Sequence, residues 1–191
     1  TGFAGLTAAI EAATARKRVV VIEKMKRAGG NSIISDGGIA APGTDIQRKW
    51  GIADSEQRMY DDMLRAGLGM NHPALLRTVV DGAKCAVEWT IDTLHVPYLD
   101  RIDLFGGHSV ARCLTPEGIT GATILRKMLQ KCDELAIPIR YDTSLRSILT
   151  DEHACVQGRP TFSTPGCSVF YSSTSITRGR GALPALHTHT P

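Results

Sequence analysis

The first twenty-three residues restrict the fold of this chain more than any other segment. Gly2-Phe3-Ala4-Gly5 precedes an alanine-rich stretch, and four β-branched residues, Val19 to Ile22, then lead to Glu23. This order matches the last four positions of a G-x-G-x-x-G pattern, then a helix, a buried parallel strand and an acid about 20 residues further on. The sequence therefore predicts a dinucleotide-binding unit that is entered after its first strand. A plain βαβ unit is the alternative.

Each part of this pattern has a physical role in binding a pyrophosphate. The first turn of a helix has unpaired N–H groups and a partial positive charge, which attract an anion. We expect Gly2 to let the backbone approach the phosphates and Gly5 to let the helix pack closely on the sheet. Glu23, at the carboxyl end of the predicted strand, is placed to accept hydrogen bonds from ribose hydroxyls.

Two further stretches of small residues follow the acid. Gly29-Gly30-Asn31-Ser32 and Gly37-Gly38-Ile39-Ala40-Ala41 are close enough to form one surface of exposed backbone. A large, flat cofactor that lies along the chain needs such a surface, because few side chains then stand in its way. A loop that only turns the chain is the other interpretation. Since the stretches follow Glu23-Lys24-Met25, we interpret them as a second cofactor-contact loop.

Four segments resemble the flavoprotein subunit of the fumarate reductase and succinate dehydrogenase superfamily. They are TGFAGLTAAIEAA, VVVIEKMKRAGGNSIISDGGIAAPGT, DDMLRAGLGMNHPALLRTVV and GGHSVAR. Within the superfamily they are most similar to soluble fumarate reductases and flavocytochrome c type proteins, including urocanate reductase-like members. The resemblance covers residues 1–158. It implies an α/β fold: a Rossmann-like FAD-binding domain with a parallel sheet, its first strand missing, and the start of a helical inserted region.

The resemblance also implies which residues hold FAD. It assigns contacts with the FAD pyrophosphate to Gly2, Ala4 and Gly5, and contact with the adenosine ribose to Glu23. Five further residues would line the rest of the cofactor: Lys24, Asn31, Ser32, Gly37 and Gly38.

The implied activity is transfer of a hydride between flavin N5 and an unsaturated acid such as fumarate, or the reverse, succinate oxidation. In the family an arginine delivers the proton, and further Arg and His residues hold the carboxylates. Nothing in residues 1–158 matches that set, so no catalytic residue is predicted. The implied partners are a dicarboxylate or related unsaturated acid and an electron-donor domain or subunit outside this chain. The alternatives are a ketosteroid dehydrogenase or L-aspartate oxidase relative on the same cofactor domain, and a non-catalytic truncated remnant.

At 191 residues the chain could bury one ordinary core, whereas members of the family are more than twice as long. We therefore expect an N-terminal fragment of the flavoprotein that is inactive alone. Because the first strand of the sheet is missing, we also expect it to bind flavin weakly or not at all.

Composition excludes several other classes of protein. No apolar run reaches the 18 or more residues of a membrane span, and no signal peptide is visible, so the compartment is left open. The five cysteines form no C-x-x-C pair, which indicates neither a metal site nor a disulfide framework. Acidic and basic residues balance one another up to residue 158, so nucleic-acid binding is not predicted.

The middle of the chain predicts two helices, the first beginning at Ser55 and the second at Pro73, which suits a first helical turn. We expect His72 to support the turn between them. Three methionines are expected to fill a core: Met59, Met63 and Met70. Two short strands are predicted later, at Ile137–Tyr141 and Ser144–Leu149.

Residues 106–112, with the sequence GGHSVAR, form a second candidate site. Two glycines, a titratable ring, a hydroxyl and a guanidinium on one loop could hold an anion or face a flavin. A structural loop in which Arg112 forms a salt bridge is an equally good interpretation. A role for His108 as an acid or base is the third.

The composition changes after Gly158. Residues 159–191 contain no Asp, Glu or Lys, while Ser, Thr, Pro and Gly dominate. We therefore divide the chain into a partial FAD-binding domain with a helical insertion, residues 1–158, and a tail, residues 159–191. The tail is expected to be disordered or to arise from a change of reading frame. A genuine Ser/Thr-rich tail is the alternative.

Overall fold

A computed structural model describes residues 1–153, 161–164 and 167–170 of the chain. The helices are α1 (Phe3–Thr14), α2 (Asp45–Lys49), α3 (Glu56–Ala66), α4 (Pro73–Asp92) and α5 (Gly121–Glu134), with one 3-10 turn, η1 (Gly30–Ser32). The strands are β1 (Val21–Ile22), β2 (Ile39–Ala40), β3 (Cys113–Leu114), β4 (Ile139–Arg140), β5 (Ser144–Ser147), β6 (Thr161–Thr164) and β7 (Cys167–Phe170).

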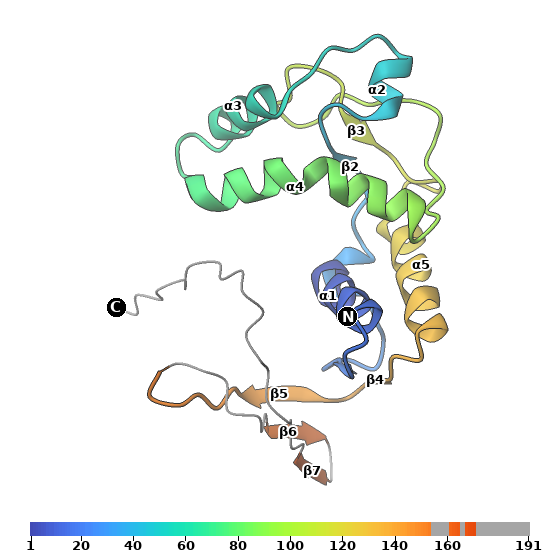
Figure 1. Ribbon diagram of the computed structural model, residues 1–191, viewed down its shortest axis with the longest axis vertical. Coiled ribbons are helices and arrows are strands. Elements are labelled where there is room, and N and C mark those ends of the chain that lie inside the picture. Colours follow the sequence, from blue (N-terminus) through green and yellow to red (C-terminus); the bar gives the residue numbers. More distant parts are fainter. Residues whose placement is uncertain (154–160, 165–166, 171–191) are drawn as a thin grey trace.

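The elements form three groups along the long axis of the molecule (Figure 1). Helices α2, α3 and α4 lie at one end together with β2 and β3, and α1 and α5 lie in the middle with β1 and β4. The sheet of β5, β6 and β7 lies at the other end. Segments that are distant in sequence therefore meet in the middle group, where the first helix of the chain packs against the fifth.

Helices α3 and α4 begin where the sequence predicts them. The Ser55 side chain caps α3 by accepting a hydrogen bond from the Arg58 amide. Pro73 occupies the first turn of α4, and the His72 ring accepts from the Leu75 amide at 3.4 Å. The predicted supporting role of His72 is confirmed, because its side chain caps the second helix.

Helices α3 and α4 bury a stripe of side chains against β2 and β3, which we call the α3–α4 cluster. It consists of Ala41, Met59, Leu76, Val80, Ala83, Val87 and Leu114. The core positions on α4 recur every three or four residues, as a one-sided helix requires. The two strands pair antiparallel, with Ile39 opposite Leu114.

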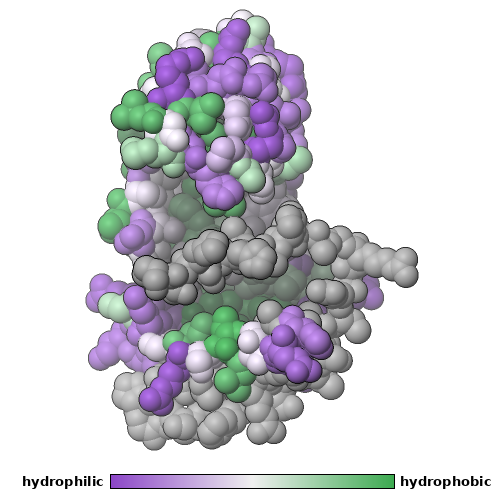
Figure 2. Space-filling view, turned by 90° about the vertical axis from the view of Figure 1, so that its left-hand side faces the viewer, coloured by the Kyte–Doolittle hydropathy of each residue, from purple (hydrophilic) through white to green (hydrophobic). Residues whose placement is uncertain are grey.

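The prediction for Met70 was wrong. Met59 is buried in the α3–α4 cluster and Met63 packs at its edge, but Met70 is 83% exposed. The reason is that α3 ends at Ala66, so Met70 lies in the turn that follows and not on the helical face. Figure 2 views the molecule from the side on which this turn lies, and hydrophobic residues are scattered there among hydrophilic ones.

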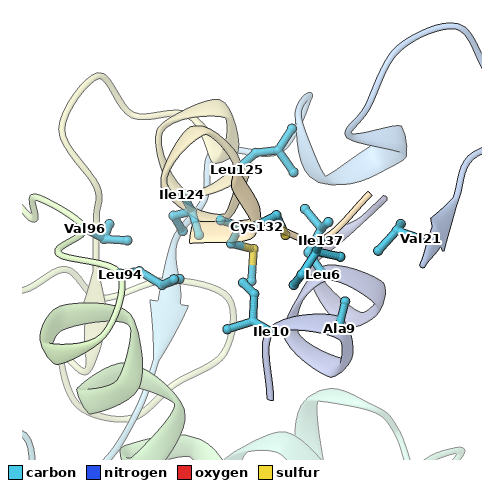
Figure 3. Close-up of a cluster of buried hydrophobic side chains, with 11 residues drawn as sticks. Leu6, Ala9, Ile10, Val21, Leu94, Val96, Ile124, Leu125, Cys132 and Ile137 are labelled. Atoms are coloured by element: carbon cyan, nitrogen blue, oxygen red, sulfur yellow. The ribbon is translucent and has the colours of Figure 1, made fainter. Parts of the chain in front are cut away.

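The middle group has its own core, which we call the α1–α5 cluster. Figure 3 shows side chains from α1 and α5 pointing toward one another, with Leu6 and Ile10 fully buried. The cluster consists of Leu6, Ala9, Ile10, Val21, Leu94, Val96, Ile124, Leu125, Met128, Cys132 and Ile137. The alanines of α1 let the two helices approach closely, and the branched residues fill the space between them.

The sheet of the middle group is parallel, as predicted. Val21 of β1 pairs with Ile139 of β4, and Ile22 pairs with Arg140. The hydrogen-bonded part of the first strand is shorter than the predicted run from Val19 to Ile22. Each strand follows a helix of the α1–α5 cluster, so the carboxyl end of β1 places Glu23 beside that core.

The last sheet is antiparallel, with β6 between β5 and β7. Strands β4 and β5 fall within the two segments predicted to be strands. The predicted boundary at residue 158 lies outside the described residues, as does most of the predicted tail. Within residues 159–191 the structure describes only the backbone of β6 and β7, so the prediction of a separate tail stays a prediction.

Candidate functional site

The start of α1 presents backbone amides without a side chain to cover them. Gly2 is the N-cap residue and provides no side-chain hydrogen bond to the helix. Ala4 and Gly5 are exposed, and in the described part of the chain their amides have no hydrogen-bond partner. A helix start with unpaired amides attracts a phosphate group, both through these donors and through the helix dipole.

The two glycines of this turn have different surroundings. A Cβ on Gly2 would lie 3.2 Å from the Ser32 hydroxyl oxygen, so a side chain there would press on the neighbouring loop. A Cβ on Gly5 would meet no described atom within 4 Å. The expected role of Gly5 in close packing of the helix on the sheet stays a prediction, because no described residue lies against this position. What Gly5 provides is an open approach to its amide.

Glu23 lies directly after β1 and is held by donors on both carboxylate oxygens. The Thr1 hydroxyl and the Thr1 nitrogen donate to Oε2, and the Met25 amide donates to Oε1 at 2.8 Å. Burial opposes ionisation of the carboxyl, but the hydrogen bonds from Thr1 and Met25 and the charge of the Thr1 nitrogen outweigh it and lower the pKa of Glu23 to about 2. Oε1 accepts one described donor and keeps a free lone pair for a further donor, such as a ribose hydroxyl.

The first glycine loop is tied to both α1 and Glu23. The Gly29 amide donates to Thr1 Oγ1 at 3.1 Å, and the Phe3 amide donates to Ser32 Oγ at 3.1 Å. Thr1 thus bridges the acid and the loop, a role that the sequence reasoning missed. No residue pattern in the sequence indicates this role, because it depends on contacts with Glu23 and Gly29, more than 20 residues away.

The other predicted residues of the loop lie on the surface. Lys24, Asn31 and Gly38 are exposed, and the hydrogen bonds of residues 1–153 do not involve the side chains of Lys24 and Asn31. The Gly38 amide donates to Asp36 Oδ1 at 3.0 Å. Gly37 is buried and has a φ of 75°, which disfavours any residue with a side chain.

The structure therefore brings most of the predicted cofactor residues together. Hydrogen bonds of Thr1 and Ser32 connect the start of α1, the acid after β1 and the first glycine loop. The second glycine pair continues this loop toward β2.

Residues 106–112 belong to a buried charge cluster at some distance in sequence from the glycine loops. The Arg112 side chain is fully buried and forms two hydrogen bonds of 2.8 Å with Asp54, one to each oxygen. It also donates to Asp62 Oδ2 at 2.8 Å. The interpretation of Arg112 as the centre of a salt bridge is confirmed. Such a bidentate, desolvated pairing fixes the guanidinium in place.

The two carboxylates of this cluster carry further donors. Asp62 Oδ2 accepts from the amide and the hydroxyl of Ser109, and Asp54 accepts from Gln47 Nε2 at 2.9 Å. Burial opposes ionisation of Asp62, yet the Ser109 and Arg112 donors outweigh it and lower the pKa of Asp62 to about 2. The same balance, with Arg112 and Gln47 as donors, lowers the pKa of Asp54.

His108 borders this cluster. Its Nδ1 lies 2.7 Å from Arg112 Nη1, and since arginine can only donate, Nδ1 accepts and the ring proton is on Nε2. Burial and the neighbouring guanidinium lower the pKa of His108, which favours the neutral ring. Together with Gly106 and Asp62, the ring lines a cavity of about 200 Å³. The predicted acid or base role stays a prediction.

A larger cavity, of about 540 Å³, lies along α5 and is lined by residues such as Thr123 and Lys127, none of them a predicted cofactor residue. Within the described ranges, no three His, Cys, Asp or Glu side chains gather as metal ligands would. Nor does any helix in those ranges combine the length and apolarity of a membrane crossing.

Comparison with known proteins identifies related sequences. A family model described as an FAD binding domain matches residues 1–189. The chain is 40% identical over 161 residues to the acrylate reductase flavoprotein subunit of Shewanella woodyi, which covers 83% of this chain and 31% of that protein. It is 36% identical over 158 residues to the urocanate reductase of Eggerthella lenta, covering 82% of this chain and 26% of that protein. The chain thus spans about a third or less of the length of these relatives.

The same relationship is visible in solved structures. The open conformation of a flavocytochrome c3 fumarate reductase superposes with a TM-score of 0.78 at 26% identity, covering 85% of this chain and 28% of that one. A 3-ketosteroid-Δ4-(5α)-dehydrogenase from Rhodococcus jostii gives a TM-score of 0.76 at 21% identity, over 90% of this chain and 42% of that one, which shows a shared fold alone. The parallel β1–β4 pair and the packed helices α1 and α5 therefore belong to a Rossmann-like cofactor domain.

Proposed function

This chain belongs to the FAD binding domain family, its cofactor is FAD, and on that premise we propose that residues 1–38 bind the ADP half of FAD and one side of its flavin. The observation that carries the proposal is the open start of α1. The unpartnered amides of Ala4 and Gly5 lie in a turn that Thr1 and Ser32 tie to the acid and to the glycine loop. These residues fit the cofactor, because a pyrophosphate needs donors and room but no neutralising side chain.

The contacts proposed for each residue follow from this geometry. Gly2, Ala4 and Gly5 would approach the pyrophosphate through their backbone, and Glu23 would accept a ribose hydroxyl on Oε1. The remaining residues would line the cofactor further along the loop: Lys24, Asn31, Ser32, Gly37 and Gly38. The Ser32 hydroxyl oxygen already accepts a hydrogen bond from the Phe3 amide, so its part is to shape the site.

When bound, FAD supplies hydride transfer between its N5 and a carbon of the substrate. The residues of this chain would bind and orient the cofactor and leave the substrate to other residues. Arg112 is the most buried guanidinium described, and it is committed to Asp54 and Asp62, so it is not available to hold a substrate carboxylate. No catalytic residue is proposed in this chain.

For the whole protein we propose reduction of a carbon–carbon double bond in an unsaturated acid. The relatives named for acrylate, urocanate and fumarate act on substrates that share a double bond next to a carboxylate. Electrons would come from a donor domain or subunit outside this chain. The likeness to ketosteroid dehydrogenases extends to the fold alone and supports no second substrate class.

The domain division is part of this proposal. Residues 1–158 would form the cofactor part, with α3 and α4 as the start of a helical inserted region and residues 159–191 as a separate tail. The α3–α4 cluster supports the separation of the helical region from the rest of the cofactor part, since its buried residues form a second core, distinct from the α1–α5 cluster.

Titration of the chain with FAD and with ADP, followed by NMR, tests the proposal. We expect saturable binding of both, weaker than FAD binding by a full-length relative, and a loss of affinity in the Glu23→Gln variant. Glu117→Gln, which changes an exposed acid, is the matched control and should bind as the unmodified chain does. Absence of any binding, or equal loss in both variants, would contradict the proposed site. Purification of the chain with stoichiometric FAD would contradict only the expected weakness.

A further inference from the structure

We propose that Gly121, the first residue of α5, is a positioning residue of the cofactor site. The absence of a side chain at Gly121 determines where the loop of residues 29–38 lies over the start of α1. The expected effect on FAD affinity rests on the proposed function. Gly121 itself lies outside every segment predicted to contact the cofactor.

Gly121 touches the loop through its backbone. Its amide donates to the Ser35 carbonyl at 2.8 Å. A Cβ built on Gly121 would overlap with the Ser32 carbonyl oxygen and would lie close to Ser35 Oγ and to the Phe3 ring. The Ser32 carbonyl is backbone and also accepts from Ser35 Oγ at 2.9 Å, so it cannot turn aside as a flexible side chain would. Any side chain at Gly121 must therefore move the loop.

The loop meets α5 with a glycine of its own. A Cβ on Gly37 would lie 2.9 Å from the Gly121 amide nitrogen and 2.9 Å from Pro116 Cγ. Gly37 also has a φ of 75°, so the loop turns toward the helix at this residue. Two backbones thus meet without side chains between them, which is the closest approach that protein segments can make.

A second contact fixes the beginning of the loop on the same helix. A Cβ on Gly29 would lie 2.8 Å from Cδ2 of Leu125, one turn further along α5. The first two turns of α5 therefore support the loop at Gly29, Ser32 and Gly37. Strand β4 follows α5 in the chain, so α5 links the position of the loop to the position of the parallel sheet.

The position of Ser32 matters for the phosphate-binding turn. Its hydroxyl accepts from the Phe3 amide at 3.1 Å, and Phe3 is the first residue of α1. A loop displaced by a side chain at Gly121 would withdraw this acceptor and disturb the turn that presents the amides of Ala4 and Gly5. The consequence for FAD is loss of affinity without loss of any residue that contacts it.

Gly121→Ala is the test, with Gly82→Ala as the matched control. Gly82 is exposed within α4, and a Cβ there meets no described atom within 4 Å. Each variant is titrated with FAD by NMR, and the hydrogen exchange of the Phe3 amide and the thermal unfolding midpoint are measured. We expect Gly121→Ala to weaken FAD binding by about tenfold or more, because displaced groups no longer meet the cofactor in the required geometry. Hydrogen exchange of the Phe3 amide should become faster, because its acceptor on Ser32 is withdrawn. Gly82→Ala should leave FAD binding unchanged, should not speed exchange at Phe3, and should raise the unfolding midpoint slightly.

The outcomes separate this inference from the proposed function. If the unmodified chain binds no FAD, the proposed function fails, while the exchange rate at Phe3 in Gly121→Ala still decides the positioning role. If Gly121→Ala binds FAD like Gly82→Ala and exchanges Phe3 at the same rate, the positioning role is refuted.

A measurement on the unmodified chain covers the case in which Gly121→Ala does not fold. Exchange of the Gly121 amide, which is bonded to Ser35, should slow when FAD is added. An unchanged rate under saturating FAD would overturn the inference.

Discussion

Glu23 remains ionised in the folded chain although little of it reaches solvent, and this makes stability depend on pH. Its pKa is lowered from 4.5 to about 2, so the folded state binds fewer protons than the unfolded state between these values. The stabilisation is complete above pH 4.5 and is lost as the pH falls toward 2. Asp62, with its pKa lowered to about 2, adds to the same loss.

We expect Glu23→Gln to flatten this pH dependence. The amide cannot titrate, so the free energy of unfolding should fall less steeply between pH 4.5 and pH 2 than in the unmodified chain. Urea unfolding at pH values within and above this window measures the difference. The exposed variant Glu117→Gln should leave the slope unchanged, and an equal slope in Glu23→Gln would refute the assignment.

Arg112 gives the largest effect expected from a single charged residue. Arg112→Met removes the donor from two buried carboxylates, and breaking a buried pair in this way costs about 3–5 kcal/mol. The exposed pair of Lys49 and Asp100 provides the control, because Lys49→Met should cost no more than about 1 kcal/mol. Chemical denaturation of both variants tests this contrast, and similar losses in the two would contradict it.

At the scale of elements, two glycines near α3 and α4 predict opposite responses to the same substitution. Gly82 lies inside α4 in open space, so Gly82→Ala should stabilise the chain by up to about 1 kcal/mol. A Cβ on Gly67 would overlap with the side-chain amide of Asn71, whose Oδ1 is buried without a partner in the described chain. Gly67→Ala should therefore destabilise, and thermal melts of the pair would show shifts of opposite sign.

The helices were the most predictable part of the fold. Capping residues and apolar spacing locate α3 and α4 because these signals are local, and Ser55 and Pro73 mark their first turns correctly. Met70 was misplaced because the same spacing continues past the residue where α3 ends. After α3 the backbone of Leu68 takes a positive φ and the Asn71 side chain donates to the Met63 carbonyl, an arrangement that the apolar spacing does not reveal.

The candidate site was predictable only where one segment supplies it. The start of α1, the acid after β1 and the glycine loop each follow a known pattern of residues. The support from Gly121 and the joining of Arg112 to Asp54 depend on segments far apart in the chain, and no local spacing indicates them. At residues 106–112, the burial of Arg112 with Asp54 decides in favour of a structural salt bridge over an anion-binding loop. Composition alone does not show which side chains are buried.

At the scale of the whole molecule, α4 connects the two cores. Its residues Val80 and Val87 lie in the α3–α4 cluster, while the Trp89 indole donates to Glu11 of α1 at 2.7 Å. Tyr98 packs against both clusters and shares a hydrogen bond of 2.9 Å with Thr90. These contacts predict that the two cores unfold together.

Tryptophan fluorescence can test this cooperation. The chain has two tryptophans, and Trp50→Phe leaves Trp89 as the only one, at the contact between α4 and α1. We expect the urea transition seen by Trp89 to coincide with the loss of helical circular dichroism, as two-state unfolding requires. Separate midpoints would show that the cores unfold independently.

The support of the glycine loop by α5 also orders events while the chain is being made. Synthesis proceeds from the N-terminus, so the phosphate-binding turn and the glycine loop leave the ribosome well before Gly121 does. Until α5 and β4 emerge, Gly37 has no helix to rest on and Val21 lacks its partner Ile139. A nascent chain therefore carries the residues of the cofactor site long before it has the site itself, and FAD can act as a ligand of the fold only after residue 140 has been added.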